Sequence, residues 1–195
     1  RRNMAGWGRH LAREGFVAAV PDLPAWSDQA RNGRFLSELR AELAAREPWR
    51  SRIDPSRVGL VGFSAGGLAT LLSAADSPAV AVWIGLDPVD RNGLGAGAAP
   101  RVGCRALVLT AEPSACNAHG NARGILAALP GAVHVRVGGA VHVDAEWPTS
   151  GLAELACGRS TEEKRTEFRD RATAALREAL AAEAGPRDAG PGPHE

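Results

Sequence analysis

The sequence lacks tyrosine, contains one lysine, Lys164, and has no apolar run near the ~20 residues that a bilayer-spanning helix needs. Its 23 basic and 22 acidic residues nearly cancel, which excludes the strongly basic surface of most nucleic-acid-binding proteins. The N-terminus shows no charged region followed by an apolar run and a cleavage site, so it indicates no compartment. An upstream signal peptide would make the protein secreted or periplasmic. Nothing in the composition indicates an oligomeric state.

Cysteine is scarce as well, with three residues, so at least one of them is unpaired. Cys104 borders an apolar strand and is interpreted as a small buried hydrophobic residue. Cys116 and Cys157 both fall in predicted loops. A disulfide between them is expected if the protein is exported, and two reduced thiols if it is cytosolic. Cys116 and His119 have the spacing of half a zinc site, but no second half follows, so no metal is expected.

Helical and strand-like periods alternate along the chain, which predicts an α/β fold with a mostly parallel sheet covered by helices on both faces. A chain of 195 residues has room for one domain. We expect this domain to span 1–185, followed by a disordered tail over 186–195. The expected strands are 16–20, 57–61, 79–86, 105–110 and 132–137. The expected helices are 7–14, 34–46, 66–75, 121–129 and a last one opened by a Ser160 to Glu163 capping box, and 92–100 is expected to be a loop.

The most informative stretch is 58–67, where an apolar strand runs into Gly62-Phe63-Ser64-Ala65-Gly66 and then into a helical pattern. A serine hydroxyl is a weak nucleophile and must be exposed on a tight strand-to-helix turn where a base can take its proton. Glycines two residues before and after Ser64 remove side chains that would collide in such a turn. The motif alone arises by chance in a glycine-rich chain, but this setting predicts that Ser64 is a nucleophile.

His142 is the preferred candidate for the base that would serve Ser64. It follows the last predicted strand and a flexible Gly138-Gly139 loop, from which it can reach the same sheet edge as the serine. The other four histidines are interpreted as solvated, surface or loop residues; they are His10, His119, His134 and His194.

Two acidic residues compete to orient the base. Asp87 ends the strand after the serine turn, and Glu112 ends the next strand. Both would lie at the carboxyl edge of the sheet, where the sites of open α/β sheets occur. The order Ser64, Asp87, His142 matches the chain order of the nucleophile, acid and base in α/β-hydrolases. Asp87 is therefore preferred, and Glu112 stays open as the alternative acid.

Three segments carry a resemblance to the α/β-hydrolase superfamily, and within it to chlorophyllase-like and lipase-like esterases. They are Gly62-Phe63-Ser64-Ala65-Gly66-Gly67, Gly85-Leu86-Asp87-Pro88-Val89-Asp90 and Gly138-Gly139-Ala140-Val141-His142-Val143-Asp144. The second resembles the turn in which chlorophyllases and pancreatic-type lipases place their acid; dienelactone hydrolases place it one strand later. The resemblance covers roughly 5–182. It implies the C-terminal three-quarters of the fold, without the first strands and without the loop that supplies one oxyanion donor.

The resemblance implies a serine ester hydrolase acting on a small-molecule or lipid ester, without a cofactor. The backbone N–H of Ala65 would supply one oxyanion donor. Trp26 and Trp147, both in predicted loops, are candidates to line a substrate pocket, although loop packing explains them equally well. An acyltransferase on the same fold, and an inactive fragment or non-catalytic binding domain, remain as alternatives.

Overall fold

The computed structural model describes residues 2–182. The expected tail over 186–195 and the proposed end of the domain at residue 185 lie outside this range, as does His194. The four strands are β1 (Val58–Phe63), β2 (Val80–Leu86), β3 (Arg105–Thr110) and β4 (Val133–Arg136). The α-helices are α1 (Ala5–Arg13), α2 (Gln29–Ala45), α3 (Ser64–Ala75), α4 (Leu94–Ala98), α5 (Arg123–Ala128), α6 (Gly151–Cys157) and α7 (Glu162–Ala182).

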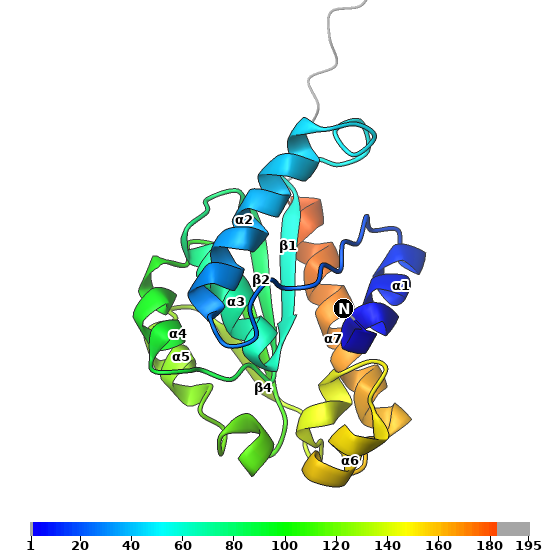
Figure 1. Ribbon diagram of the computed structural model, residues 1–195, viewed down its shortest axis with the longest axis vertical. Coiled ribbons are helices and arrows are strands. Elements are labelled where there is room, and N and C mark those ends of the chain that lie inside the picture. Colours follow the sequence, from blue (N-terminus) through cyan, green and yellow to red (C-terminus); the bar gives the residue numbers. More distant parts are fainter. Residues whose placement is uncertain (1, 183–195) are drawn as a thin grey trace, which may run out of the picture.

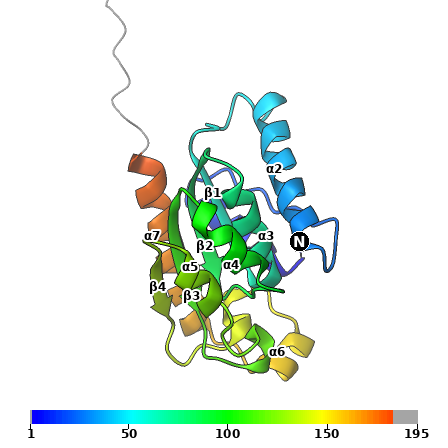
Figure 2. The same cartoon turned by 90° about the vertical axis from the view of Figure 1, so that its left-hand side faces the viewer.

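The strands form one parallel sheet in the order β1-β2-β3-β4, which confirms the predicted α/β class. Helices α2, α3, α4 and α5 lie on one side of this sheet, and α1 and α7 lie on the other (Figure 1, Figure 2). Because all strands run the same way, their carboxyl ends meet at one edge. Ser64, Asp87 and Ala111 therefore follow their strands at the same edge.

Two apolar cores, one on each face, explain the continuous apolar runs of the central strands. On β2, Ile84 packs in the core beneath α7, around Phe168, which is fully buried. Its neighbour Trp83 packs in the opposite core with Leu71 of α3. Adjacent strand residues point to opposite faces, so a strand covered on both sides must be apolar at every position.

The expected strand over 16–20 is wrong: this segment is irregular and has no ladder partner among the described residues. A strand needs a neighbour to pair its backbone groups, and the sheet begins at β1 instead. Val17 is 56% exposed. Phe16 still packs against the core, so the apolar pattern of the segment indicated a contact with the core but not a strand.

The expected loop over 92–100 contains a helix, α4, followed by the 3-10 turn Ala99–Arg101. The carboxylate of Asp90 accepts hydrogen bonds from the N–H groups of Gly95, at 2.7 Å, and Ala96, at 3.1 Å. These groups lie at the helix start, where backbone donors lack partners within the helix. A carboxylate from the preceding turn therefore offsets the poor helix propensity of this glycine-rich segment.

Two further differences concern one additional helix and one helix cap. Helix α6 was not expected; its N-cap is Ser150, whose hydroxyl accepts from Ala153 N at 3.2 Å. The predicted cap of the last helix is shifted by one residue, because Thr161 Oγ1 accepts from Lys164 N at 3.3 Å while Ser160 donates to Glu154. Short polar side chains cap helices equally well at neighbouring positions, so tertiary contacts decided which one does so here.

None of the helices within 2–182 combines the length and apolar character required to cross a membrane.

Candidate active site

Ser64 occupies a strained turn between β1 and α3. Its φ is 52°, a left-handed value that non-glycine residues rarely adopt. The turn depends on Gly62, where a Cβ would lie 2.3 Å from Thr70 Oγ1 and 2.4 Å from the carbonyl oxygen of Gly66. At Gly66 a Cβ would meet nothing within 4 Å. The expectation that both flanking glycines avoid collisions is therefore wrong for Gly66.

Gly67, the next residue, is the position where a side chain would collide. A Cβ there would lie 2.8 Å from Cβ of Pro88, because α3 packs closely against the turn that follows β2. The same turn donates Val89 N–H to the carbonyl oxygen of Ser64 at 3.1 Å. The serine turn and the Asp87 turn are thus joined directly.

His142 lies in the 3-10 helix η4 (His142–Ala145), 78 residues beyond the serine. Its Nε2 atom lies 3.0 Å from Ser64 Oγ, and its Nδ1 atom lies 2.6 Å from Asp87 Oδ2. The imidazole is 7% exposed and stacks at 4.6 Å, centre to centre, on the ring of Phe63. These contacts join Ser64, His142 and Asp87 in one hydrogen-bonded chain at the carboxyl edge of the sheet.

Asp144 holds the turn that carries His142. Its carboxylate accepts from Val141 N and from Thr161 N, each at 2.7 Å. The first bond closes η4, and the second ties it to the start of α7. The position of the imidazole is therefore tied to the longest helix of the fold.

Asp87 is 1% exposed and also has a positive φ, 42°. Besides His142, its carboxylate receives Ala111 N–H at 3.1 Å and Asn117 Nδ2–H at 3.0 Å. A buried carboxylate is stable in its charged form only where such donors replace water. Three donors from three segments therefore hold this group in place.

Glu112, the alternative acid, does not reach the imidazole in this arrangement. Its Oε1 accepts from Gly139 N at 3.1 Å, its Oε2 lies 3.9 Å from Arg136 Nη1, and the side chain is 47% exposed. The two acids leave their strands in different directions. Only Asp87 meets His142.

Ala65 immediately follows the serine in the first turn of α3. The N–H groups of a first turn have no partner within the helix. Phe63, at the N-cap, supplies no side-chain acceptor to that turn. The donor expected for an oxyanion therefore sits beside Ser64.

The two tryptophans proposed to line a pocket have different surroundings. Trp26 is 98% exposed. Trp147 packs between α1 and α7, with the guanidinium of Arg169 4.5 Å from its ring centre and a backbone N–H from Gly6 to its carbonyl at 2.9 Å. These contacts describe a packing role for Trp147.

Cys116 and Cys157 are joined by a disulfide, with Cα atoms 5.7 Å apart. The link connects the 3-10 helix η3 (Ala115–Asn117) with the end of α6. Cys104 is the free cysteine and is half-buried. Among residues 2–182, no cluster of three or more histidine, cysteine or acidic side chains could hold a metal ion.

The other histidines of the described range have separate contacts. His10 bonds Thr173 at 2.9 Å between helices, so its expected solvation is wrong. His134 bonds Thr110 on the neighbouring strand, also at 2.9 Å. His119 lies in the turn after η3 with a φ of 56°. None of these three is bonded to Ser64.

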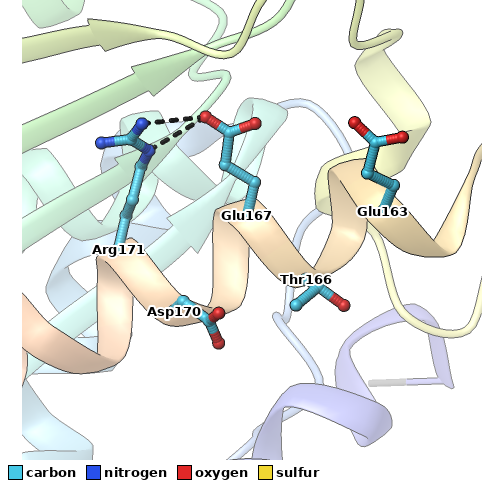
Figure 3. Close-up of a pocket in the computed structure, with 5 residues that line it drawn as sticks. All are labelled: Glu163, Thr166, Glu167, Asp170 and Arg171. Atoms are coloured by element: carbon cyan, nitrogen blue, oxygen red, sulfur yellow. Dashed lines mark hydrogen bonds and ion pairs between the residues drawn. The ribbon is translucent and has the colours of Figure 1, made fainter.

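A surface hollow lies on α7, lined by Glu163, Thr166, Glu167, Asp170 and Arg171 (Figure 3). The guanidinium of Arg171 pairs with Glu167 within it. All five lining residues belong to α7, and Ser64, Asp87 and His142 are not among them. This hollow is therefore separate from the candidate active site.

The sequence assigns no role to Asn117, and it offers Asp144 only as a remote candidate for the acid, not as the residue that holds the His142 turn. Asp144 closes the segment that contains His142, but its bond to Thr161 joins residues 17 positions apart, and Asn117 bonds Asp87 across 30 positions. The only local signal for Asn117 is its place after Cys116 in a polar turn. Contacts of this kind become visible only when the loops are placed together.

The chain is similar to known hydrolases both in sequence and in structure. The bis(hydroxyethyl) terephthalate hydrolase of Streptomyces coelicolor is 37% identical over 87 residues, which are 44% of this chain and 28% of that protein. A dienelactone hydrolase from Anabaena variabilis matches the structure with a TM-score of 0.57 at 20% identity, over 78% of this chain and 62% of that one. The matches thus span less than two thirds of either protein. No protein-family model matches the sequence.

The likeness to the solved hydrolase and the parallel, helix-covered sheet assign the α/β-hydrolase fold to this chain.

Proposed function

We propose that this chain, which has the α/β-hydrolase fold, is a serine hydrolase that cleaves carboxylic esters through an acyl-enzyme intermediate. The observation that carries the proposal is the pair of hydrogen bonds made by His142, 3.0 Å to Ser64 Oγ and 2.6 Å to Asp87 Oδ2. An imidazole bonded in this way to a hydroxyl and a buried carboxylate can act as a general base. The two similar proteins are both named as hydrolases, which supports the reaction class.

In the proposed reaction, Ser64 Oγ attacks the ester carbonyl carbon while its proton passes to His142 Nε2. Asp87 stabilises the imidazolium that forms. The N–H of Ala65 donates to the oxyanion of the tetrahedral intermediate. When the intermediate collapses, the alcohol leaves with the proton from His142. A water molecule, deprotonated by the same imidazole, then attacks the acyl group and releases the acid and free Ser64. The chemistry requires no metal or organic cofactor.

The substrate is proposed to be a small-molecule or lipid ester. The curated relative is named for bis(hydroxyethyl) terephthalate, so this aromatic diester is a reasonable probe beside a simple acyl ester. The acid at the end of β2 also underlies the narrower resemblance to chlorophyllases and lipases, which stays a prediction.

The test is turnover of p-nitrophenyl butyrate and of bis(hydroxyethyl) terephthalate by the wild type, Ser64→Ala and Ser73→Ala. Ser73 lies on the same helix and its hydroxyl contacts Ser37 at 2.9 Å, so it controls for loss of a hydroxyl from α3. We expect Ser64→Ala to lose at least about 10³-fold in kcat and Ser73→Ala to stay close to the wild type. Equal rates for Ser64→Ala and the wild type would overturn the proposal. Transfer of the acyl group to an added alcohol in preference to water would instead indicate an acyltransferase.

A further inference from the structure

Asn117 makes four hydrogen bonds from a single, 1% exposed amide. Its Nδ2 donates to Asp87 Oδ2 at 3.0 Å and to the carbonyl oxygen of Glu112 at 2.9 Å. Its Oδ1 accepts from Ser114 N at 2.8 Å and from Gly120 N at 3.0 Å. Both N–H bonds and both oxygen lone pairs of the amide are therefore used.

These partners determine which way the amide points. The backbone N–H groups of Ser114 and Gly120, which flank η3, point at an acceptor, and the carboxylate and the carbonyl require a donor. A flipped amide would place oxygen against oxygen and N–H against N–H at all four contacts. The Nδ2 group must therefore face Asp87.

The bond to Asp87 falls on the oxygen that also meets the imidazole. Asp87 Oδ2 receives Asn117 Nδ2 and His142 Nδ1, whereas Oδ1 receives Ala111 N. Without Asn117, the carboxylate would keep one backbone donor and could rotate away from the histidine.

We infer that Asn117 is a positioning residue of this site: it holds the Asp87 carboxylate aimed at His142 Nδ1. The inference rests on the proposed function. Asn117 touches no reacting atom and acts through Asp87. Its effect is expected in the transition state, where the imidazolium forms and the aspartate is needed most.

Asn121 provides a matched control on the same loop, four residues further on. Its Nδ2 donates to the carbonyl oxygen of Asp90 at 2.6 Å, and its Oδ1 accepts from Asp90 N at 3.0 Å. Like Asn117, it fastens the loop after β3 to the loop after β2. Unlike Asn117, it contacts neither Asp87 nor His142.

The experiment compares Asn117→Ala and Asn117→Asp with Asn121→Ala and Asn121→Asp in steady-state ester hydrolysis, with Ser64→Ala in parallel. The Asn117→Asp change keeps an oxygen for the two turn N–H groups but turns the donor to Asp87 into an acceptor. We expect kcat to fall about 10- to 100-fold in Asn117→Ala, the scale of a hydrogen bond to a charged group, and further in Asn117→Asp. KM should stay within about threefold, because the contact acts on the transition state.

The Asn121 variants should retain the wild-type kcat. Equal losses in the Asn117 and Asn121 variants, or no loss in either, would overturn the inference, because Asn117 would then only fasten the loop. A raised KM at unchanged kcat would overturn it as well. Thermal unfolding of all four variants separates these effects from loss of folding.

A spectroscopic readout tests the inference independently of activity. A proton shared between His142 Nδ1 and a carboxylate gives a far-downfield proton resonance, which can be assigned by its absence in Asp87→Asn. We expect this resonance to shift or broaden in Asn117→Asp and to persist unchanged in Asn121→Asp. An unchanged resonance in Asn117→Asp would contradict the inference even if Ser64→Ala proved fully active and the hydrolase proposal failed.

Discussion

Asp87 Oδ2 lies 2.6 Å from His142 Nδ1, although 55 residues separate them in the sequence. The neighbouring acid at the same sheet edge, Glu112, is occupied by Gly139 N instead. The contact therefore distinguishes two carboxylates that the strand pattern left equivalent.

Asp87→Asn should lower kcat by about 10³- to 10⁴-fold, because an amide at this position can hold the imidazole in the wrong tautomer and cannot stabilise the imidazolium. Glu112→Gln should keep kcat within about threefold, since the amide oxygen can still accept the hydrogen bond from Gly139 N. Kinetics on p-nitrophenyl butyrate check both variants. The reverse ranking would identify Glu112 as the acid.

The serine turn should tolerate substitution at one glycine and not at the others. Gly62→Ala and Gly67→Ala place a Cβ 2.3 Å from Thr70 Oγ1 and 2.8 Å from Pro88 Cβ, respectively. Overpacking of this kind destabilises a fold by roughly 1–3 kcal/mol. Gly66→Ala adds a Cβ in open space and should leave stability unchanged or slightly raised. Urea unfolding ranks the three variants, and an equal loss at Gly66 would contradict the steric explanation.

The disulfide should support both stability and activity. It closes a loop across 41 residues, for which chain entropy alone gives about 4 kcal/mol. Cys116 is next to Asn117 in the chain, and Cys157 ends α6, which contacts η4. The Cys116→Ser, Cys157→Ser double variant should melt at a lower temperature and have a lower kcat.

Dithiothreitol should act on the wild type in the same direction and have no further effect on the double variant. Cys104→Ser, which changes the half-buried free thiol, is the matched control. A wild type whose melting temperature and kcat are insensitive to full reduction would show that the link is dispensable.

Glu146 should make stability depend on pH. Burial raises the pKa of its carboxyl group above 4.5, against the opposing hydrogen bond from Asn3, and Oε2 has no partner among the described residues. Since the folded pKa exceeds the unfolded one, the contribution to stability is full below pH 4.5 and is lost as pH rises through the folded pKa.

Glu146→Gln removes that charge. The variant should therefore be more stable than the wild type at pH 8, and the difference should shrink toward pH 4.5. Unfolding free energies measured across this range check the prediction. Glu178→Gln, which replaces a 78% exposed carboxylate paired with Arg105, is the control. A difference for Glu146→Gln that does not vary with pH would contradict the account.

Local patterns sufficed wherever an element is specified by its own residues. The apolar runs of β2 and β3 predicted buried parallel strands, and the glycine-flanked Ser64 predicted a strand-to-helix turn at the observed place. They failed where a distant partner was needed. Phe16 to Val20 has an apolar pattern but no neighbouring strand, and α4 forms because Asp90 caps it from the preceding turn.

The sequence by itself therefore determined the fold class, the turn at Ser64 and the short set of acids and bases able to serve it, since these depend on residues close together in the chain. Only the tertiary structure decided which of them meet. Parallel pairing brings the ends of β1 and β2 together, Asp144 ties the His142 turn to α7, and Asn117 aims Asp87 at the imidazole. No periodic pattern in the sequence predicts hydrogen bonds between loops that are far apart in the chain, because these bonds depend on where the packed sheet places each loop.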